Sequence, residues 1–131
     1  MIINQFHSGT ATGDAITNQM LFIQKVLIEE GYESNIYAEY IPAELNSKIK
    51  SIDKYKGNKE NVMLVHHSMG FDAFDKIISL PDKKILVYHN ITPEKFFDDE
   101  GIKYYIRKGH QQVKEYKDYM LSAIADSNYN R

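Results

Sequence analysis

The sequence predicts an α/β domain with a Rossmann-like, doubly wound parallel sheet of about five strands and helices on both faces. Two observations carry this prediction. The apolar runs at residues 62–65 and 85–88 lack polar alternation, which is typical of strands buried on both faces of a parallel sheet. Segments with helical periodicity separate the strand segments along the chain. The length of 131 residues predicts one domain, residues 1–131.

The first unit is a strand, a glycine loop and a helix start. The apolar run Met1-Ile2-Ile3 leads into a loop at residues 9–13. Gly9 and Gly13 allow positive φ and a close approach of the backbone to a ligand. The first turn of the next helix presents unpaired N–H groups, which suit a phosphate or a sugar hydroxyl. The alternative is that the two glycines only make the turn.

The first helix is predicted over residues 14–30. Thr12 and Asp14 are both candidates for its N-cap, and Gly31 is placed to end it. Its apolar residues recur at four, three and four positions, which puts them on one helical face. They are Ile16, Met20, Ile23 and Leu27.

A second strand is predicted at residues 34–38, and the residues after it show no clear helical or strand periodicity. Residues 39–61 contain a proline, a glycine and five lysines, and predict a surface connection with at most a short helical piece. The lysines are read as a solvated face, with an anion site as the alternative.

The remaining elements follow the same alternation. After the strand at 62–65, a helix with Phe71, Phe74, Ile77 and Ile78 on its apolar side is closed by Pro81. After the strand at 85–88, the longest helix covers residues 101–119, and a fifth strand at 122–125 precedes the start of another helix. The predicted inner face of the longest helix is Ile102, Ile106, Val113, Tyr116 and Met120.

Polar side chains follow the strands at the carboxyl edge of the predicted sheet. Ligands of such sheets bind at this edge, near the switch in strand order. Four of the five histidines fall there, and the adjacent His66 and His67 point to opposite sides of their strand. The candidate rim residues are His7, His66, His67, His89, Asn90, Asp126 and Ser127, beside Gly9, Gly13 and Asp14 of the first loop.

Several kinds of site lack their motif in this sequence. There is no His-Glu-x-x-His, no Gly-x-Ser-x-Gly, no Walker loop and no Gly-x-Gly-x-x-Gly, so we expect no metal and no dinucleotide cofactor. A formal net charge of -2 argues against a nucleic-acid partner. The chain has no cysteine, no signal-peptide pattern and no apolar run near 18 residues, which predicts a cytoplasmic protein.

Five motifs follow one another along nearly the whole chain. The first motif is Asn4-Gln5-Phe6-His7 leading to Gly13-Asp14-Ala15-Ile16, and the second is Gly31-Tyr32-Glu33-Ser34-Asn35-Ile36-Tyr37-Ala38. The others are His66-His67-Ser68-Met69-Gly70, His89-Asn90-Ile91-Thr92-Pro93 and Ala125-Asp126-Ser127-Asn128-Tyr129-Asn130-Arg131. Taken in this order, they resemble the N-terminal domain of bacterial family 4 glycosyltransferases, which have the GT-B architecture of two Rossmann-like domains.

The resemblance implies a hexosyltransferase that moves a sugar from a nucleotide sugar to a cell-surface polysaccharide or lipid-linked acceptor, with retention and without a metal. By position, the loop at 9–13 would line the cleft, His89 would contact the donor hexose as the catalytic residue, and Asp126 and Ser127 would shape the floor. The family's C-terminal nucleotide-sugar domain is missing, so we expect this half to be inactive alone and to associate with itself.

Two alternatives remain open at this stage. One is a free-standing doubly wound binding or interaction module without catalysis. The other concerns the helix at 101–119, which has a basic outer face with tyrosines nearby. Such a face predicts peripheral contact with the inner face of the membrane. Because Glu115 and Asp118 interrupt the positive charge, the alternative is an ordinary solvated face. The basic residues are Lys103, Arg107, Lys108, Lys114 and Lys117.

Overall fold

The computed structural model describes residues 1–89, 95, 98–116 and 118–125, and it confirms the predicted fold class. Six parallel strands form one sheet in the order β3-β2-β1-β4-β5-β6. The strands are β1 (Ile3–Gly9), β2 (Ile36–Tyr40), β3 (Lys50–Ser51), β4 (Val62–His67), β5 (Lys83–Tyr88) and β6 (Ser122–Ala125).

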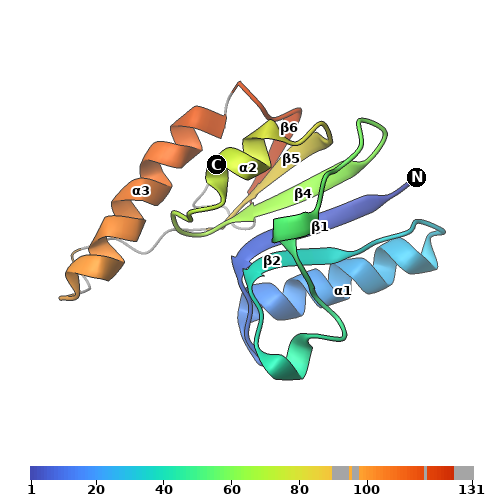
Figure 1. Ribbon diagram of the computed structural model, residues 1–131, viewed down its shortest axis with the longest axis horizontal. Coiled ribbons are helices and arrows are strands. Elements are labelled where there is room, and N and C mark those ends of the chain that lie inside the picture. Colours follow the sequence, from blue (N-terminus) through green and yellow to red (C-terminus); the bar gives the residue numbers. More distant parts are fainter. Residues whose placement is uncertain (90–94, 96–97, 117, 126–131) are drawn as a thin grey trace.

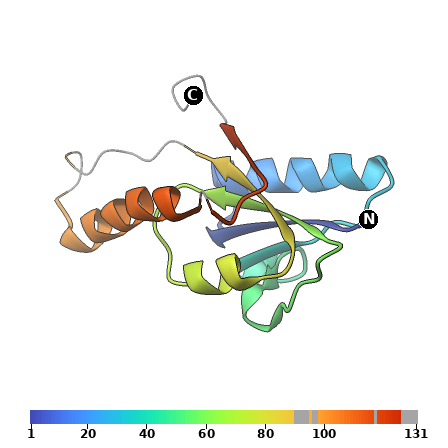
Figure 2. The same cartoon turned by 90° about the horizontal axis from the view of Figure 1, so that it is seen from above.

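Helices cover both faces of this sheet (Figures 1 and 2). Helix α1 (Ala15–Glu29) lies on one face. Helices α2 (Phe74–Ser79) and α3 (Glu100–Tyr116) lie on the other. Two short 3-10 turns, Ala43–Leu45 and Ile52–Lys54, lie in the connection between β2 and β4.

The core divides into two clusters because successive strand residues point to opposite faces. The larger cluster lies on the α2–α3 face and is rich in aromatic rings, among them Phe6, Phe71, Phe74 and Tyr116. The smaller cluster lies on the α1 face and is built around Met20. Its other buried members are Ile36, Ala38, Leu45 and Ile49.

The predicted caps of α1 are confirmed. Asp14 is the N-cap, since its Oδ2 accepts hydrogen bonds from the backbone N–H and the hydroxyl of Thr17, each at 3.0 Å. Gly31 follows the helix with φ +96°, a conformation that glycine adopts without strain.

The sequence prediction was wrong at four points. It put Phe71 on a helix, although α2 begins at Phe74. It placed β3 in a surface connection, because a two-residue strand has no periodicity to detect and exists only through its pairing with Tyr37 and Ala38. It extended α3 to Tyr119, although the described helix ends at Tyr116. It put Ile102 on the inner face of α3, although this side chain is 37% exposed. The buried residues of α3 are Ile106, Gly109, Gln112 and Tyr116.

The helix predicted after β6 lies outside the described residues. Within the described part of the chain, no helix has both the length and the apolarity that crossing a bilayer requires.

Candidate functional site

The switch in strand order lies between β1 and β4. From β1 the chain moves outward to β2 and β3, then returns to the other side of β1 for β4, β5 and β6. Connections on the two sides therefore diverge above the carboxyl ends of β1 and β4, which opens a crevice in folds of this kind.

A pocket of about 230 Å³ occupies this crevice, and we call it the rim pocket. It is built from the carboxyl ends of three neighbouring strands and one helix. The lining residues used below are Gly9 at the end of β1, Glu39 and Tyr40 of β2, Phe71 and Asp72 after β4, and Tyr105 of α3.

Two carboxyl groups of the rim pocket have pKa values displaced in opposite directions. Burial raises the pKa of Glu39, whose Oε1 accepts a 3.4 Å hydrogen bond from the backbone N–H of Ala73. Asp72 accepts hydrogen bonds from Lys108 at 3.0 Å and from the Tyr105 hydroxyl at 3.2 Å, and the Lys108 contact lowers its pKa most. The two carboxyl groups of the pocket therefore differ in how readily they take up a proton.

Of the glycine loop at residues 9–13, Gly9 lines this pocket, and the parts of the loop differ in role. Gly13 has φ +82°, so a non-glycine residue would be strained there. A Cβ built on Gly9 meets no atom within 4 Å, so the backbone at Gly9 is open on that side. Asp14 was a candidate substrate ligand, and its carboxylate is engaged in capping α1.

His66 and His89 lie on the α1 face of the sheet in a buried hydrogen-bond chain. Gln5 Nε2 donates to the carbonyl of Met20 at 2.8 Å, which leaves Gln5 Oε1 as the acceptor from His66 Nε2 at 2.9 Å. His66 Nδ1 lies 2.9 Å from His89 Nε2.

The partners in this hydrogen-bond chain fix the tautomer of His66. Burial lowers the pKa of His66 to about 3, so the ring is neutral at pH 7 and carries its single proton on Nε2. His66 Nδ1 therefore accepts, and His89 Nε2–H donates to it. The His89 ring is thereby held against His66.

His7 orients the hydroxyl of Ser68 across the switch point. Its Nδ1 donates to the carbonyl of Gly9 at 2.6 Å, because a carbonyl oxygen can only accept. Burial lowers the pKa of His7, so its Nε2 is an unprotonated acceptor at neutral pH and the Ser68 hydroxyl donates to it at 2.8 Å. The ends of β1 and β4 are thereby tied together.

His67 lies on the opposite face from the other three, in the α2–α3 core. Its side chain is fully buried against Tyr116, and Nε2 donates to the carbonyl of Gly109 at 3.0 Å. Burial lowers the pKa of His67 to about 4. The structure therefore brings three of the four predicted histidines to one side of the rim, and strand alternation accounts for the fourth.

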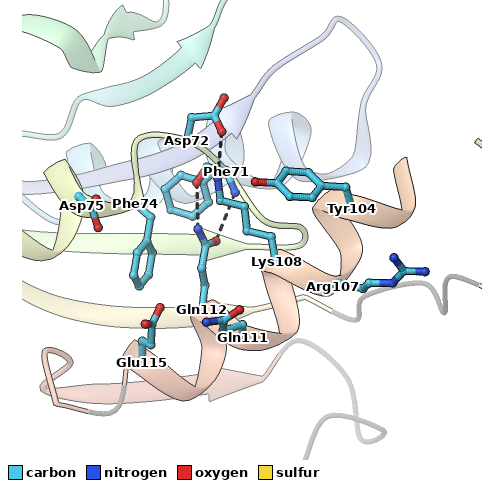
Figure 3. Close-up of a pocket in the computed structure, with 10 residues that line it drawn as sticks. All are labelled: Phe71, Asp72, Phe74, Asp75, Tyr104, Arg107, Lys108, Gln111, Gln112 and Glu115. Atoms are coloured by element: carbon cyan, nitrogen blue, oxygen red, sulfur yellow. Dashed lines mark hydrogen bonds and ion pairs between the residues drawn. The ribbon is translucent and has the colours of Figure 1, made fainter. Parts of the chain in front are cut away.

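A second pocket of about 360 Å³ lies between α2 and α3 (Figure 3). Gln112 closes its wall with two hydrogen bonds to the backbone of Phe71, donating to its carbonyl at 2.9 Å and accepting from its N–H at 3.2 Å. Lys108 projects from α3 toward Asp72 (Figure 3). The sequence prediction had placed Lys108 on the outer face of α3, and this contact corrects it.

The sequence analysis missed Glu39, Tyr40, Asp72 and Tyr105. Glu39 and Tyr40 end β2 and obey the same carboxyl-edge rule that selected the histidines, so that rule could have found them. Asp72 and Tyr105 meet only through the packing of α3, which leaves no local signal. Asn90, Asp126 and Ser127 lie outside the described residues.

The described residues contain no group of three or more histidine, cysteine, aspartate or glutamate side chains that could hold a metal ion. No family model, no curated protein and no solved structure matches the chain. What the molecule does must therefore be argued from its fold and its rim.

Proposed function

We propose that this chain is the acceptor-side half of a retaining glycosyltransferase, which transfers a hexose from a nucleotide sugar to a saccharide or lipid-linked acceptor. The observation that carries the proposal is the rim pocket at the switch point, which combines carboxyl groups with tyrosine rings and an open glycine backbone. Carboxylates accept hydrogen bonds from hydroxyls, and aromatic rings pack against the apolar faces of sugars. The five sequence motifs support the same class.

We assign each rim residue a role from its chemistry. Glu39 would accept a hydrogen bond from the acceptor hydroxyl and, with its raised pKa, could take the proton released on transfer. The exposed backbone at Gly9 would let the donor approach closely. His89, held by His66, would contact the donor hexose.

Transfer also requires that the donor be held in register with the acceptor, and positioning of this kind contributes much of the rate enhancement in two-substrate reactions. In the proposed enzyme a second domain faces the rim and binds the nucleotide. We therefore expect saccharide binding by the 131-residue chain without transfer.

Site-resolved NMR titration of the ¹⁵N-labelled chain tests the proposal. We expect neutral monosaccharides to shift the amides of Gly9, Glu39 and Tyr40, and Glu39→Gln to weaken saccharide binding at least fivefold. Glu60→Gln, an exposed carboxylate outside the rim pocket, is the matched control. Absence of shifts at the rim for every sugar would contradict the proposal and favour a module with another ligand.

A further inference from the structure

Two further pockets lie next to the rim pocket along α3. The pocket between α2 and α3 shares Phe71 and Asp72 with the rim pocket. A third pocket, of about 260 Å³, shares Phe74, Asp75 and Glu115 with the second. The three pockets are therefore neighbours along α3, and we call them together the α3 groove.

The α3 groove is long compared with the rim pocket. The helical wall of the groove runs from Tyr105, which lines the rim pocket, to Glu115, which lines both the second and the third pocket. Ten residues of α-helix span roughly 15 Å at about 1.5 Å per residue. A ligand that filled the groove would therefore be an extended chain.

The walls of the groove combine aromatic rings with carboxyl and amide groups. Phe71 and Phe74 lie beside Gln112 and Glu115, Lys108 reaches Asp72 next to Phe71, and Tyr104 lies farther along α3 in Figure 3. Rings offer flat apolar surface, whereas amides and carboxylates exchange hydrogen bonds with hydroxyls. This combination suits a chain with alternating apolar faces and hydroxyl edges.

Charge in the groove disfavours anions. Carboxylates line all three pockets, whereas the lining cations are Arg107 and Lys108 of the middle pocket. Lys108 is paired with Asp72 at 3.0 Å and lies 5.6 Å from the centre of the Tyr105 ring. The five carboxylates are Glu39, Asp72, Asp75, Glu115 and Asp118.

We propose that the α3 groove binds the body of a neutral oligosaccharide acceptor, with the sugar that is extended seated in the rim pocket. This inference rests on the proposed function and names its substrate class as a chain of at least three uncharged sugars. The distal groove then contributes affinity through contacts that a single sugar cannot reach.

The test compares neutral oligosaccharides of one to six residues, drawn from gluco-, galacto- and manno-configured series, by NMR titration of the labelled chain. We expect affinity to rise at least tenfold from one sugar to three and to level off beyond. Amide shifts should spread from Glu39 to Phe74 and Glu115 as the chain lengthens. Uronate-containing oligosaccharides of the same length should bind at least fivefold more weakly.

A distal double variant, Asp75→Asn with Glu115→Gln, should remove the length dependence and keep monosaccharide binding at the rim. Glu100→Gln is the matched control, because Glu100 is exposed at the start of α3 and does not line the groove. Circular dichroism and a melting curve check that each variant is folded.

The outcomes separate the two proposals. Equal affinity for one sugar and for longer chains, with shifts confined to the rim, would contradict oligosaccharide binding in the α3 groove. The proposed function would be unaffected by that result. A preference for uronate-containing chains would contradict the proposal that the ligand of the groove is uncharged. Absence of binding by every saccharide overturns both.

Discussion

The two faces of the sheet are packed by different means. The α2–α3 face is held by aromatic rings in edge and tilted contacts, such as Phe74 with Tyr116 at 4.9 Å between ring centres. The α1 face buries a hydrogen-bond chain through Gln5, His66 and His89. It also leaves apolar side chains of α1 uncovered, since Phe22 is 65% exposed.

The two faces therefore differ in what their packing holds in place. The ring contacts of the α2–α3 face hold the walls of the α3 groove, because close-packed interiors deform little. The hydrogen-bond chain on the α1 face instead fixes the tautomer of His66, at the cost of stability when that ring is protonated. Four predictions test this difference.

The largest loss of stability is expected from Gly109→Ala, on the α2–α3 face. A Cβ at this position would lie 2.7 Å from the backbone nitrogen of Gly70 and 3.1 Å from the carbonyl carbon of Met69. Helix propensity favours alanine by about 1 kcal/mol, but backbone atoms cannot move aside as a side chain can. We expect the free energy of unfolding to fall by about 3 kcal/mol in urea denaturation.

Gly101→Ala is the control in the same helix. Its Cβ would meet only the carboxylate of Asp99, at 3.0 Å, and a small shift of that side chain relieves the contact while its hydrogen bond from the Ile102 N–H is kept. We expect unchanged or slightly higher stability. Equal losses in both variants would show that the close approach of α3 to the end of β4 is not what limits substitution at Gly109.

The second effect is the loss of folding stability at low pH, and it tests the hydrogen-bond chain on the α1 face. His66 takes up a proton near pH 6.5 when unfolded, whereas its pKa in the folded protein is about 3. Between these values the unfolded state binds more protons, so stability is lost as the pH falls from 6.5 toward 3. At pH 5 the loss from His66 is roughly 2 kcal/mol.

His66→Gln should flatten this dependence, because glutamine can occupy the hydrogen-bond chain without titrating. The measurement is the free energy of unfolding at several pH values between 5 and 7.5, taken as a difference from the unaltered chain so that other groups cancel. His110→Gln, at an exposed position on α3, should leave the dependence as it is. A parallel slope for His66→Gln and the unaltered chain would argue against a neutral buried ring.

These variants also show what the sequence could and could not predict. Apolar runs and helical periods are local, so five of the six strands and all three helices were predictable from them. The alternation of His66 and His67 was equally local, but only the packed structure shows that it places His67 beside Tyr116. The rim pocket depends on Tyr105 reaching Asp72 from 33 positions away, which no local pattern encodes.

The third effect separates two roles for Asp14. The sequence placed it at the ligand edge, whereas the structure shows its carboxylate capping α1 through Thr17. Asp14→Ala should therefore cost about 1 kcal/mol of stability. Thr12→Ala, in the same exposed loop, should change stability by less than about 0.5 kcal/mol. A capping role predicts this difference in thermal melts, and saccharide titration of Asp14→Ala shows whether the carboxylate also binds ligand.

The smallest effect on stability is expected at the uncovered part of α1. Because Phe22 and Val26 are 65% and 40% exposed, replacing both with serine should change the free energy of unfolding by less than about 0.5 kcal/mol. The same double variant should have a large effect on self-association, since exposed apolar surface favours contact between copies. Sedimentation velocity at rising concentration measures it: we expect the unaltered chain to form oligomers and Phe22→Ser with Val26→Ser to stay monomeric. A monomeric unaltered chain at high concentration would refute the association, and a large loss of stability in the variant would mean that this side of α1 is packed after all.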